Sequence, residues 1–187
     1  MGEPALFVRL AGCNLRCSFC DTKNAWSGGR ALSVEAVAAA VEKMRRSWTA
    51  DWVCLTGGEP FLQDIGPLID RFHRGGLRVQ VETNGSIFKD HSIDWVTVSP
   101  KPPAYEAAAE FLGRAREVKL VVSRELTLRA VRRVRESFPA SVPVFFQPES
   151  NKPESRARAV RLLRRSLAAG LEEIRLGVQL HRVFGLR

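Results

Sequence analysis

Residues 5–22, with the sequence ALFVRLAGCNLRCSFCDT, contain the segment that decides the fold. The apolar run from Ala5 to Leu10 predicts a β-strand, and three cysteines with the spacing Cys-x3-Cys-x2-Cys follow it: Cys13, Cys17 and Cys20. Three thiolates this close in sequence can converge on one metal cluster. Structural zinc sites and iron–sulfur clusters normally take four protein ligands. A three-cysteine cluster therefore leaves one iron open to an external ligand.

The fourth cysteine, Cys54, lies in the apolar run Trp52–Leu55, where we expect a buried, inert thiol. The alternative for the other three is a zinc site completed by a distant histidine. No apolar run approaches the ~18 residues of a membrane helix, and the first residues do not have the pattern of a signal peptide. We therefore expect a cytoplasmic protein, in which clustered cysteines serve metal binding or catalysis rather than disulfides.

The net charge of +9 is unevenly distributed along the 187 residues. Residues 1–113 carry 12 Lys and Arg against 13 Asp and Glu, whereas residues 114–187 carry 17 against 7. The densest basic stretch, Arg156–Arg165, has Val160, Leu163 and Leu167 at helical spacing and predicts an amphipathic helix with a basic outer surface. No aromatic residues interleave with these arginines, so a solvated helix face is favoured over a nucleic-acid site.

Short apolar runs alternate with helical patterns along the chain. The expected strands are 5–10, 52–55, 77–82, 95–98, 117–122, 142–147 and 173–180; the expected helices are 33–46 with Ser33 as N-cap, 61–74, 104–113, 127–138 and 153–169. This alternation predicts one α/β domain over residues 1–187 with a mostly parallel sheet. In such folds the ligand site lies at the carboxyl ends of the strands.

Polar motifs follow four of these strands: Thr-Gly-Gly-Glu-Pro at 56–60, Glu-Thr-Asn-Gly at 82–85, Ser-Pro-Lys at 99–101 and Gln-Pro-Glu at 147–149. Glycines let a ligand approach the backbone closely, and a carboxylate can receive an ammonium group. Any one of these motifs could be a simple turn. Four of them at successive strand ends indicate a ligand site.

The cysteine spacing, with Phe19 before the last cysteine, resembles the signature of the radical S-adenosylmethionine (SAM) superfamily. The Gly-Gly-Glu motif one strand later resembles the superfamily motif that binds the amino group of SAM. The order of the motifs from about residue 7 onward resembles the 7-carboxy-7-deazaguanine synthases. The matching stretches are FVRLAGCNLRC at 7–17, CDT at 20–22, TGGEP at 56–60, ETNG at 82–85, SPK at 99–101, FQP at 146–148 and VQLHRVFGLR at 178–187.

The resemblance implies a partial (β/α) barrel of the radical SAM type. It also implies a lyase that converts 6-carboxy-5,6,7,8-tetrahydropterin to 7-carboxy-7-deazaguanine and ammonia, by a SAM-derived radical ring contraction in queuosine and 7-deazapurine biosynthesis. The implied cofactors are a 4Fe–4S cluster, SAM and Mg2+. The implied partners are the pterin, a second copy of the chain in a homodimer, and an electron donor such as flavodoxin or ferredoxin. Neither a membrane nor a nucleic acid is expected as a partner.

The resemblance also implies roles for residues at matching positions. Cys13, Cys17 and Cys20 would hold the cluster, and Thr22 would bind Mg2+. No side chain is assigned as a catalytic acid or base. The expected SAM-binding residues are Phe19, Asp21, Gly58, Glu59, Ser99, Lys101 and Gln147, and the expected substrate-binding residues are Arg9, Thr56, His181 and Arg187. Arg9 could pair bidentately with the substrate carboxylate.

Two other functions remain as alternatives. One is a glycyl-radical-type activating enzyme, which uses the same cluster and SAM but acts on a large protein. The other is a basic module that binds RNA through residues 156–165, which leaves the cysteines unexplained. The family ordinarily has a Gln-Gly-Glu-Gly-like loop before the first strand. This sequence begins at Met1, so we expect either a misassigned start or a smaller substrate site.

Overall fold

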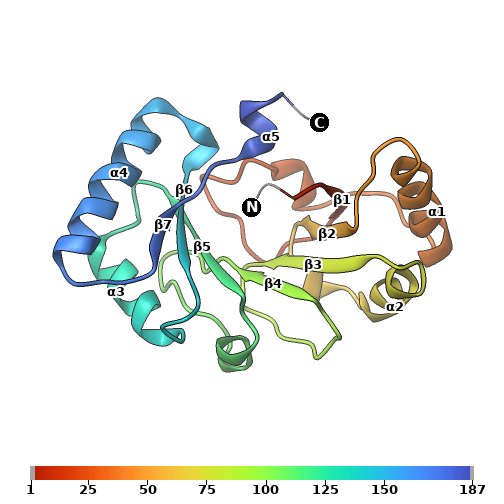
Figure 1. The fold of residues 1–187 in the computed structure, drawn as a ribbon, viewed down its shortest axis with the longest axis horizontal. Helices are drawn as coiled ribbons and strands as arrows, with labels where there is room; N and C mark the ends of the chain where they lie inside the picture. Colours follow the sequence, from red (N-terminus) through yellow and green to blue (C-terminus); the bar gives the residue numbers. More distant parts are fainter. Residues whose placement is uncertain (1–2, 186–187) are drawn as a thin grey trace. The chain divides into compact units, whose positions relative to one another are not determined.

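Seven parallel strands form the framework of the computed structural model, which describes residues 3–185 apart from the side chains of residues 181 and 182. Hydrogen-bonded neighbours follow the sequence order from β1 to β7, as expected for consecutive βα units (Figure 1). The predicted α/β class with a parallel sheet is therefore confirmed. The described residues divide into two compact units.

Unit 1 comprises the described residues up to Arg16, together with Thr22–Thr83 and Ile87–Val96. Its strands β1 (Ala5–Leu10), β2 (Trp52–Gly57) and β3 (Arg78–Thr83) pair in parallel, with Leu6 beside Val53 and Val53 beside Val79. Helices α1 (Val34–Arg45) and α2 (Gly66–Arg74) cover the apolar face of these strands (Figure 1). The helices contribute the buried side chains of Ala38, Val41, Leu68, Ile69 and Phe72.

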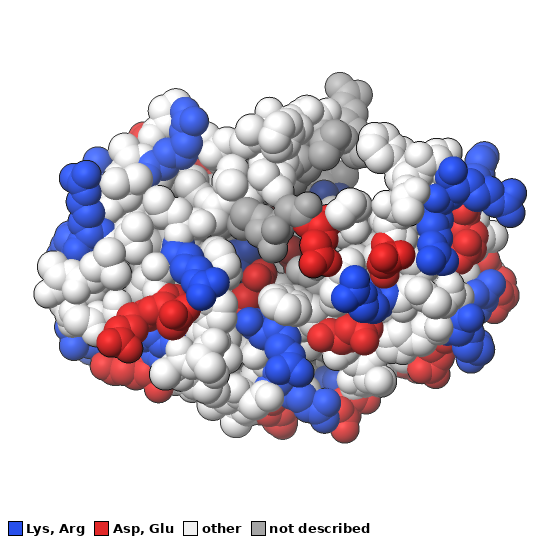
Figure 2. Space-filling view, viewed as in Figure 1, with Lys and Arg blue, Asp and Glu red and all other residues white. Residues whose placement is uncertain are grey.

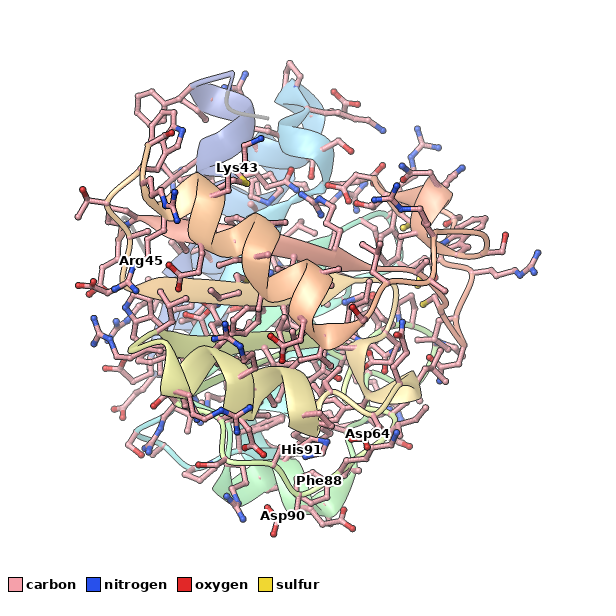
Figure 3. The ribbon with its side chains drawn as sticks, turned by 90° about the vertical axis from the view of Figure 1, so that its right-hand side faces the viewer. Lys43, Arg45, Asp64, Phe88, Asp90 and His91 are labelled. Atoms are coloured by element: carbon pink, nitrogen blue, oxygen red, sulfur yellow. The ribbon has the colours of Figure 1, made fainter. Side chains whose placement is uncertain are left out.

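The first helix begins as predicted, because the Ser33 Oγ accepts a hydrogen bond from the Ala36 amide at 3.2 Å. The second is shorter than the predicted 61–74. Residues Pro60–Leu62 form a separate 3-10 turn, η2, and α2 starts only at Gly66, where the Asp64 Oδ1 accepts from the Gly66 amide at 3.1 Å. The His91 ring lies parallel to the Phe61 ring and also borders Gly66. Figure 3 shows Asp64 and His91 near this end of α2.

Unit 2 comprises Cys17–Asp21, Asn84–Ser86 and the chain from Thr97 onward. It contains the end of β4 (Trp95–Val98) and the strands β5 (Glu117–Val122), β6 (Val144–Pro148) and β7 (Ile174–Leu176), paired in parallel. Helices α3 (Leu128–Ser137) and α4 (Pro153–Ala168) lie beside these strands (Figure 1). The Thr127 Oγ1 caps α3, and buried Arg135 donates to the carbonyls of Phe138, Pro139 and Val142 after the helix ends.

Two predicted elements of unit 2 are shorter in the structure. The predicted helix 104–113 is only the 3-10 helix η3 (Ala109–Gly113), because Tyr105 has a φ of 55° and breaks the right-handed backbone. The predicted strand 173–180 is β7 alone. After Gly177, whose amide donates to the Phe146 carbonyl at 2.8 Å, the chain leaves the sheet and forms the short helix α5 (Leu180–Val183).

The predicted apolar face of α4 is wrong. Val160 and Leu167 are 39% and 54% exposed, whereas Ser155, Ala159, Leu162 and Ser166 form the buried face. The reason is that two serines take core positions: the Ser155 Oγ donates to the Val122 carbonyl and the Ser166 Oγ to the Leu162 carbonyl. Figure 2 accordingly shows basic side chains separated by uncharged ones over α4. Among residues 3–185, no helix is long and apolar enough to cross a membrane.

Candidate active site

The two faces of the sheet in unit 1 differ in polarity. One face packs under α1 and α2, and the other carries Arg9 and Thr56, which are paired across β1 and β2. On β3, Gln80 pairs with Cys54, and alternation along the strand places Glu82 on the same face as Gln80. Arg9 is exposed and Thr56 is buried at 9% exposure. Both substrate-binding residues that were predicted in β1 and β2 therefore share one polar face.

Each backbone carbonyl of residues 10–12, just before Cys13, accepts a hydrogen bond. The carbonyl oxygens of Leu10 and Gly12 accept from the amides of Gly58 and Glu59, each at 2.8 Å. The carbonyl of Ala11, between them, accepts from Gln63 Nε2, also at 2.8 Å. The Gly12 and Cys13 amides themselves donate to the carbonyls of Ala25 and Trp26. The position of Cys13 within unit 1 is thus set by backbone contacts to two other segments.

Gly57, the last residue of β2, and Gly58, which follows it, are required by this contact. Gly57 has a φ of +118°, and a Cβ on it would lie 2.2 Å from the Leu10 carbonyl oxygen. A Cβ on Gly58 would lie 1.9 Å from the Gly12 oxygen. The predicted role of these glycines was close approach to a ligand. The structure shows that they first allow the close approach of the cysteine segment.

Glu59 is fully buried, at 0% exposure. Its Oε1 accepts from the Thr83 hydroxyl at 2.7 Å and from the Phe61 amide at 3.2 Å. These bonds tie the end of β2 to the end of β3 and to η2. Glu59, which is predicted to receive the ammonium group of SAM, therefore also joins β2 to β3 and η2 by buried hydrogen bonds.

In unit 2, side chains hold the segment Cys17–Asp21. The Cys20 amide donates to the Cys17 carbonyl at 3.1 Å, which closes a turn between the two cysteines. The Ser18 Oγ donates to Glu125 Oε1 at 3.3 Å, and Gln179 Nε2 donates to Asp21 Oδ2 at 2.7 Å. Phe19, between the cysteines, is half-buried. Asp21 therefore has a fixed neighbour more than 150 residues away in sequence.

The end of β4 leads into a second fixed polar group of unit 2. Lys101 Nζ donates to both the carbonyl and the hydroxyl oxygens of Ser99 at 2.6 Å, and the Ser99 hydroxyl donates to the Lys119 carbonyl at 2.7 Å. Gln147 lies next to Val121 across β5 and β6 and is half-buried. Ser99 and Lys101 therefore follow β4, and Gln147 lies one residue before the end of β6 in the same unit.

Of the remaining predicted site residues, the structure describes Thr22 but neither the His181 side chain nor Arg187. Thr22 is half-buried in unit 1 and precedes the 3-10 turn η1 (Lys23–Ala25), with its carbonyl accepting from the Ala25 amide. The side chain of His181 and all of Arg187 lie outside the described residues.

The chemistry of the donor set fits an iron–sulfur cluster. Within the described residues, Cys13, Cys17 and Cys20 form no disulfide and are partly accessible. Cys54 is only 1% exposed within β2, so the prediction that this thiol is buried is confirmed. Three accessible thiols in a short segment, with the fourth in the core, match a cluster with one open iron.

Comparison with known proteins identifies the class. The radical SAM superfamily profile matches residues 8–160, so the chain is a radical SAM enzyme, a class that uses a 4Fe–4S cluster and SAM.

The family follows from the relatives. The chain is 33% identical to the 7-carboxy-7-deazaguanine synthase of Aquifex aeolicus over 100% of this chain and 87% of that protein. It is 34% identical to the synthase of Methanospirillum hungatei over 99% of this chain and 79% of that protein. The crystal structure of QueE from Escherichia coli superposes with a TM-score of 0.74 at 30% identity, over 95% of this chain and 86% of that one. The chain belongs to the 7-carboxy-7-deazaguanine synthase family.

Sequence reasoning missed three residues that the structure places near predicted ones. Gln80 and Glu82 lie on the polar face of unit 1, and the alternation of polar and apolar residues along β3 was the signal that could have found them. Gln179 contacts Asp21, but no local pattern connects two residues so distant in sequence.

Proposed function

We propose that this chain converts 6-carboxy-5,6,7,8-tetrahydropterin to 7-carboxy-7-deazaguanine with release of ammonia. The single observation that carries the proposal is the polar face of unit 1. A guanidinium (Arg9) lies in register with a buried hydroxyl (Thr56), and an amide and a carboxylate (Gln80 and Glu82) occupy the same face on β3. A substrate with one carboxylate and several N–H groups needs such donors and acceptors.

In this proposal each residue has a defined task. Arg9 binds the substrate carboxylate and Thr56 offers a hydroxyl beside it, while His181 and Arg187 complete the substrate contacts by analogy with the family. Glu82 offers a carboxylate to the N–H groups of the pterin. No protein side chain needs to act as an acid or base. When bound, the cluster and SAM supply the radical chemistry, and the protein orients the ring that contracts.

The residues for the cofactors follow the same reasoning. Cys13, Cys17 and Cys20 hold the cluster. Phe19, Asp21, Gly58, Glu59, Ser99, Lys101 and Gln147 surround SAM. Thr22 offers an oxygen ligand to Mg2+, a hard cation that keeps several waters and accepts substrate oxygens as further ligands. The Lys101–Ser99 pair keeps a positive charge at a fixed place after β4, where it can meet the SAM carboxylate.

The wider setting is also proposed. The whole chain of 187 residues acts as one radical SAM domain, in keeping with a structural match that spans 95% of it. It works as a homodimer in the cytoplasm and receives electrons from a flavodoxin or ferredoxin. Partly accessible cysteines that form no disulfide within the described residues support a reducing compartment.

The test is anaerobic reconstitution with iron and sulfide, followed by SAM, dithionite, Mg2+ and carboxytetrahydropterin. We expect 7-carboxy-7-deazaguanine and one ammonia for each substrate consumed. Cys13→Ala should abolish product, whereas Cys54→Ala, which changes a buried thiol in β2, should retain it. A cluster-loaded protein that binds SAM and leaves the pterin unchanged would contradict the proposed reaction.

A further inference from the structure

Gln179 is a buried amide whose hydrogen bonds do not serve the local backbone. It stands at the N-cap of α5, yet its side chain makes no capping hydrogen bond. Its side chain instead reaches the segment Cys17–Asp21, where Nε2 donates to Asp21 Oδ2 at 2.7 Å. Only 9% of the residue is exposed. Its side chain therefore has one identified task, which is to contact Asp21.

The other half of the same amide is unsatisfied. Gln179 Oε1 is buried and has no hydrogen-bond partner in the described part of the chain. A buried acceptor without a partner costs free energy, whereas an apolar side chain of similar shape would fill the same space without that cost. Gln179 therefore carries a cost at Oε1 that offsets part of what its bond to Asp21 contributes to stability. A residue kept despite such a local cost points to a functional constraint.

The orientation of the amide is not arbitrary. If the amide were flipped, Oε1 would face the Asp21 carboxylate, and two acceptors would then be in contact. The charge on Asp21 therefore selects the orientation with Nε2 toward it. In return, the amide fixes one carboxylate oxygen of an otherwise exposed side chain. A hydrogen bond to an ionised acceptor is among the stronger ones, so it is able to select one rotamer of Asp21.

We infer that Gln179 is a positioning residue that holds the Asp21 carboxylate in the orientation needed to bind SAM. This inference rests on the proposed contact between Asp21 and SAM. Without Gln179, this carboxylate oxygen of Asp21 would lose the donor that sets its direction, and binding SAM would have to set that direction instead. Gln179 sets it in advance.

The test compares SAM affinity with stability in variants of the full-length, cluster-loaded protein. Gln179→Met keeps the length of the side chain and removes the amide, and Gln179→Glu keeps the shape and removes the donor. We expect the dissociation constant of SAM, measured by anaerobic equilibrium dialysis, to rise about tenfold in Gln179→Met, the size expected for one charge-assisted hydrogen bond, and further in Gln179→Glu. The KM for SAM should rise with it, and kcat should change little.

Stability separates positioning from packing. The thermal midpoint of Gln179→Met, measured without SAM, should stay close to that of the unaltered protein, because losing the bond to Asp21 and removing the unpaired Oε1 act in opposite directions. Glu125→Ala is the matched control, since it removes a different side-chain hydrogen bond to the same segment, the one from Ser18, without touching Asp21. It should leave SAM affinity unchanged. A lowered midpoint with unchanged SAM affinity in Gln179→Met would show a structural role and overturn the inference.

Asp21→Asn and the double variant distinguish this inference from the proposals on which it rests. We expect Asp21→Asn to weaken SAM binding and Gln179→Met to add nothing to it, because both act through one contact. If Asp21→Asn weakens SAM binding and Gln179→Met does not, the role of Gln179 alone fails. If Asp21→Asn leaves SAM binding unchanged, the assignment of Asp21 as a SAM-binding residue is wrong, and the inference on Gln179 is then wrong as well. If both variants weaken SAM binding but the pterin is not converted, the inference stands and the proposed reaction fails.

Discussion

The two units hold their parts of the cysteine segment in different ways. In unit 1 the stretch before Cys13 is held mainly by backbone hydrogen bonds, from the amides of Gly58 and Glu59 to the carbonyls of Leu10 and Gly12. In unit 2 the segment Cys17–Asp21 is held through side chains, from Ser18 to Glu125 and from Gln179 to Asp21.

The difference teaches which kind of substitution each region tolerates. Backbone bonds do not depend on side-chain identity, but they require that two chains come close, and at Gly57 and Gly58 only hydrogen fits. Side-chain bonds tolerate some movement but require particular donors and acceptors. Added volume should therefore damage unit 1, and altered hydrogen-bonding chemistry should damage unit 2.

The largest expected effect comes from Gly58→Ala. Its Cβ would lie 1.9 Å from the Gly12 oxygen and 2.5 Å from the Gly12 carbonyl carbon, so the backbone must move. We expect the free energy of unfolding to fall by about 3 kcal/mol and iron incorporation to be lost. The control is Gly113→Ala, because nothing lies within 4 Å of a Cβ at that position. Chemical denaturation and iron analysis measure both. Normal iron content in Gly58→Ala would contradict the steric account.

A medium effect is expected at Gln63. Of the three carbonyls before Cys13, two accept from backbone amides, and the third, that of Ala11, accepts from the Gln63 side chain. Gln63→Met removes the donor to the Ala11 carbonyl, and Gln63→His keeps an N–H at a similar reach. We expect Gln63→Met to lose about 1 kcal/mol of local stability, seen as faster amide exchange of Gly12 and Cys13 in the metal-free protein. Gln63→His should exchange more slowly than Gln63→Met. Equal exchange in both variants would show that the Gln63 bond is dispensable.

Asp94 gives a smaller effect that depends on pH. Burial tends to raise the pKa of this carboxyl, but the Val79 amide and His73 outweigh burial and hold its pKa below the ordinary value. Because the folded-state pKa is the lower one, the stabilisation is present above the unfolded pKa and is lost as the pH falls through the folded value. Asp94→Asn should cost about 1 kcal/mol at pH 7, given the partial exposure of the pair.

The pH dependence of that cost is its check. The difference in unfolding free energy between the unaltered protein and Asp94→Asn is followed from pH 5 downward. It should shrink below about pH 4, where the carboxyl of the unaltered protein gains its proton. A difference that grows in acid would contradict the sign of the pKa shift.

The smallest effect is expected for Glu125→Ala in unit 2. The bond from the Ser18 hydroxyl to Glu125 is exposed and 3.3 Å long, so its loss should change the unfolding free energy by less than about 0.5 kcal/mol. Amide exchange of residues 17–21 should rise slightly. A large rise would mean that Gln179 contributes less to holding this segment than we infer.

The sequence predicted much of the framework because its signals are local. The β-strands at 5–10, 95–98 and 117–122 were predicted to the residue, and so was the N-cap at Ser33, because a hydroxyl side chain precedes apolar residues at helical spacing. The helices at 61–74 and 104–113 were overextended, since tertiary contacts and a left-handed backbone at Tyr105 decide where they begin. The apolar face of α4 was wrong because buried serines satisfy their hydroxyls within the helix or on a neighbouring strand.

Three cysteines lie close together in the sequence, and the fourth lies in a strand. This pattern by itself indicated the class of cluster, because ligand spacing is a local property of the chain. The tertiary structure alone decided what holds that segment. It showed that Gly58 approaches Gly12, that Glu59 is a buried tie, and that Gln179 contacts Asp21. The physical reason is that hydrogen bonds and close contacts depend on distance in space, and residues far apart in sequence leave no local pattern of their proximity.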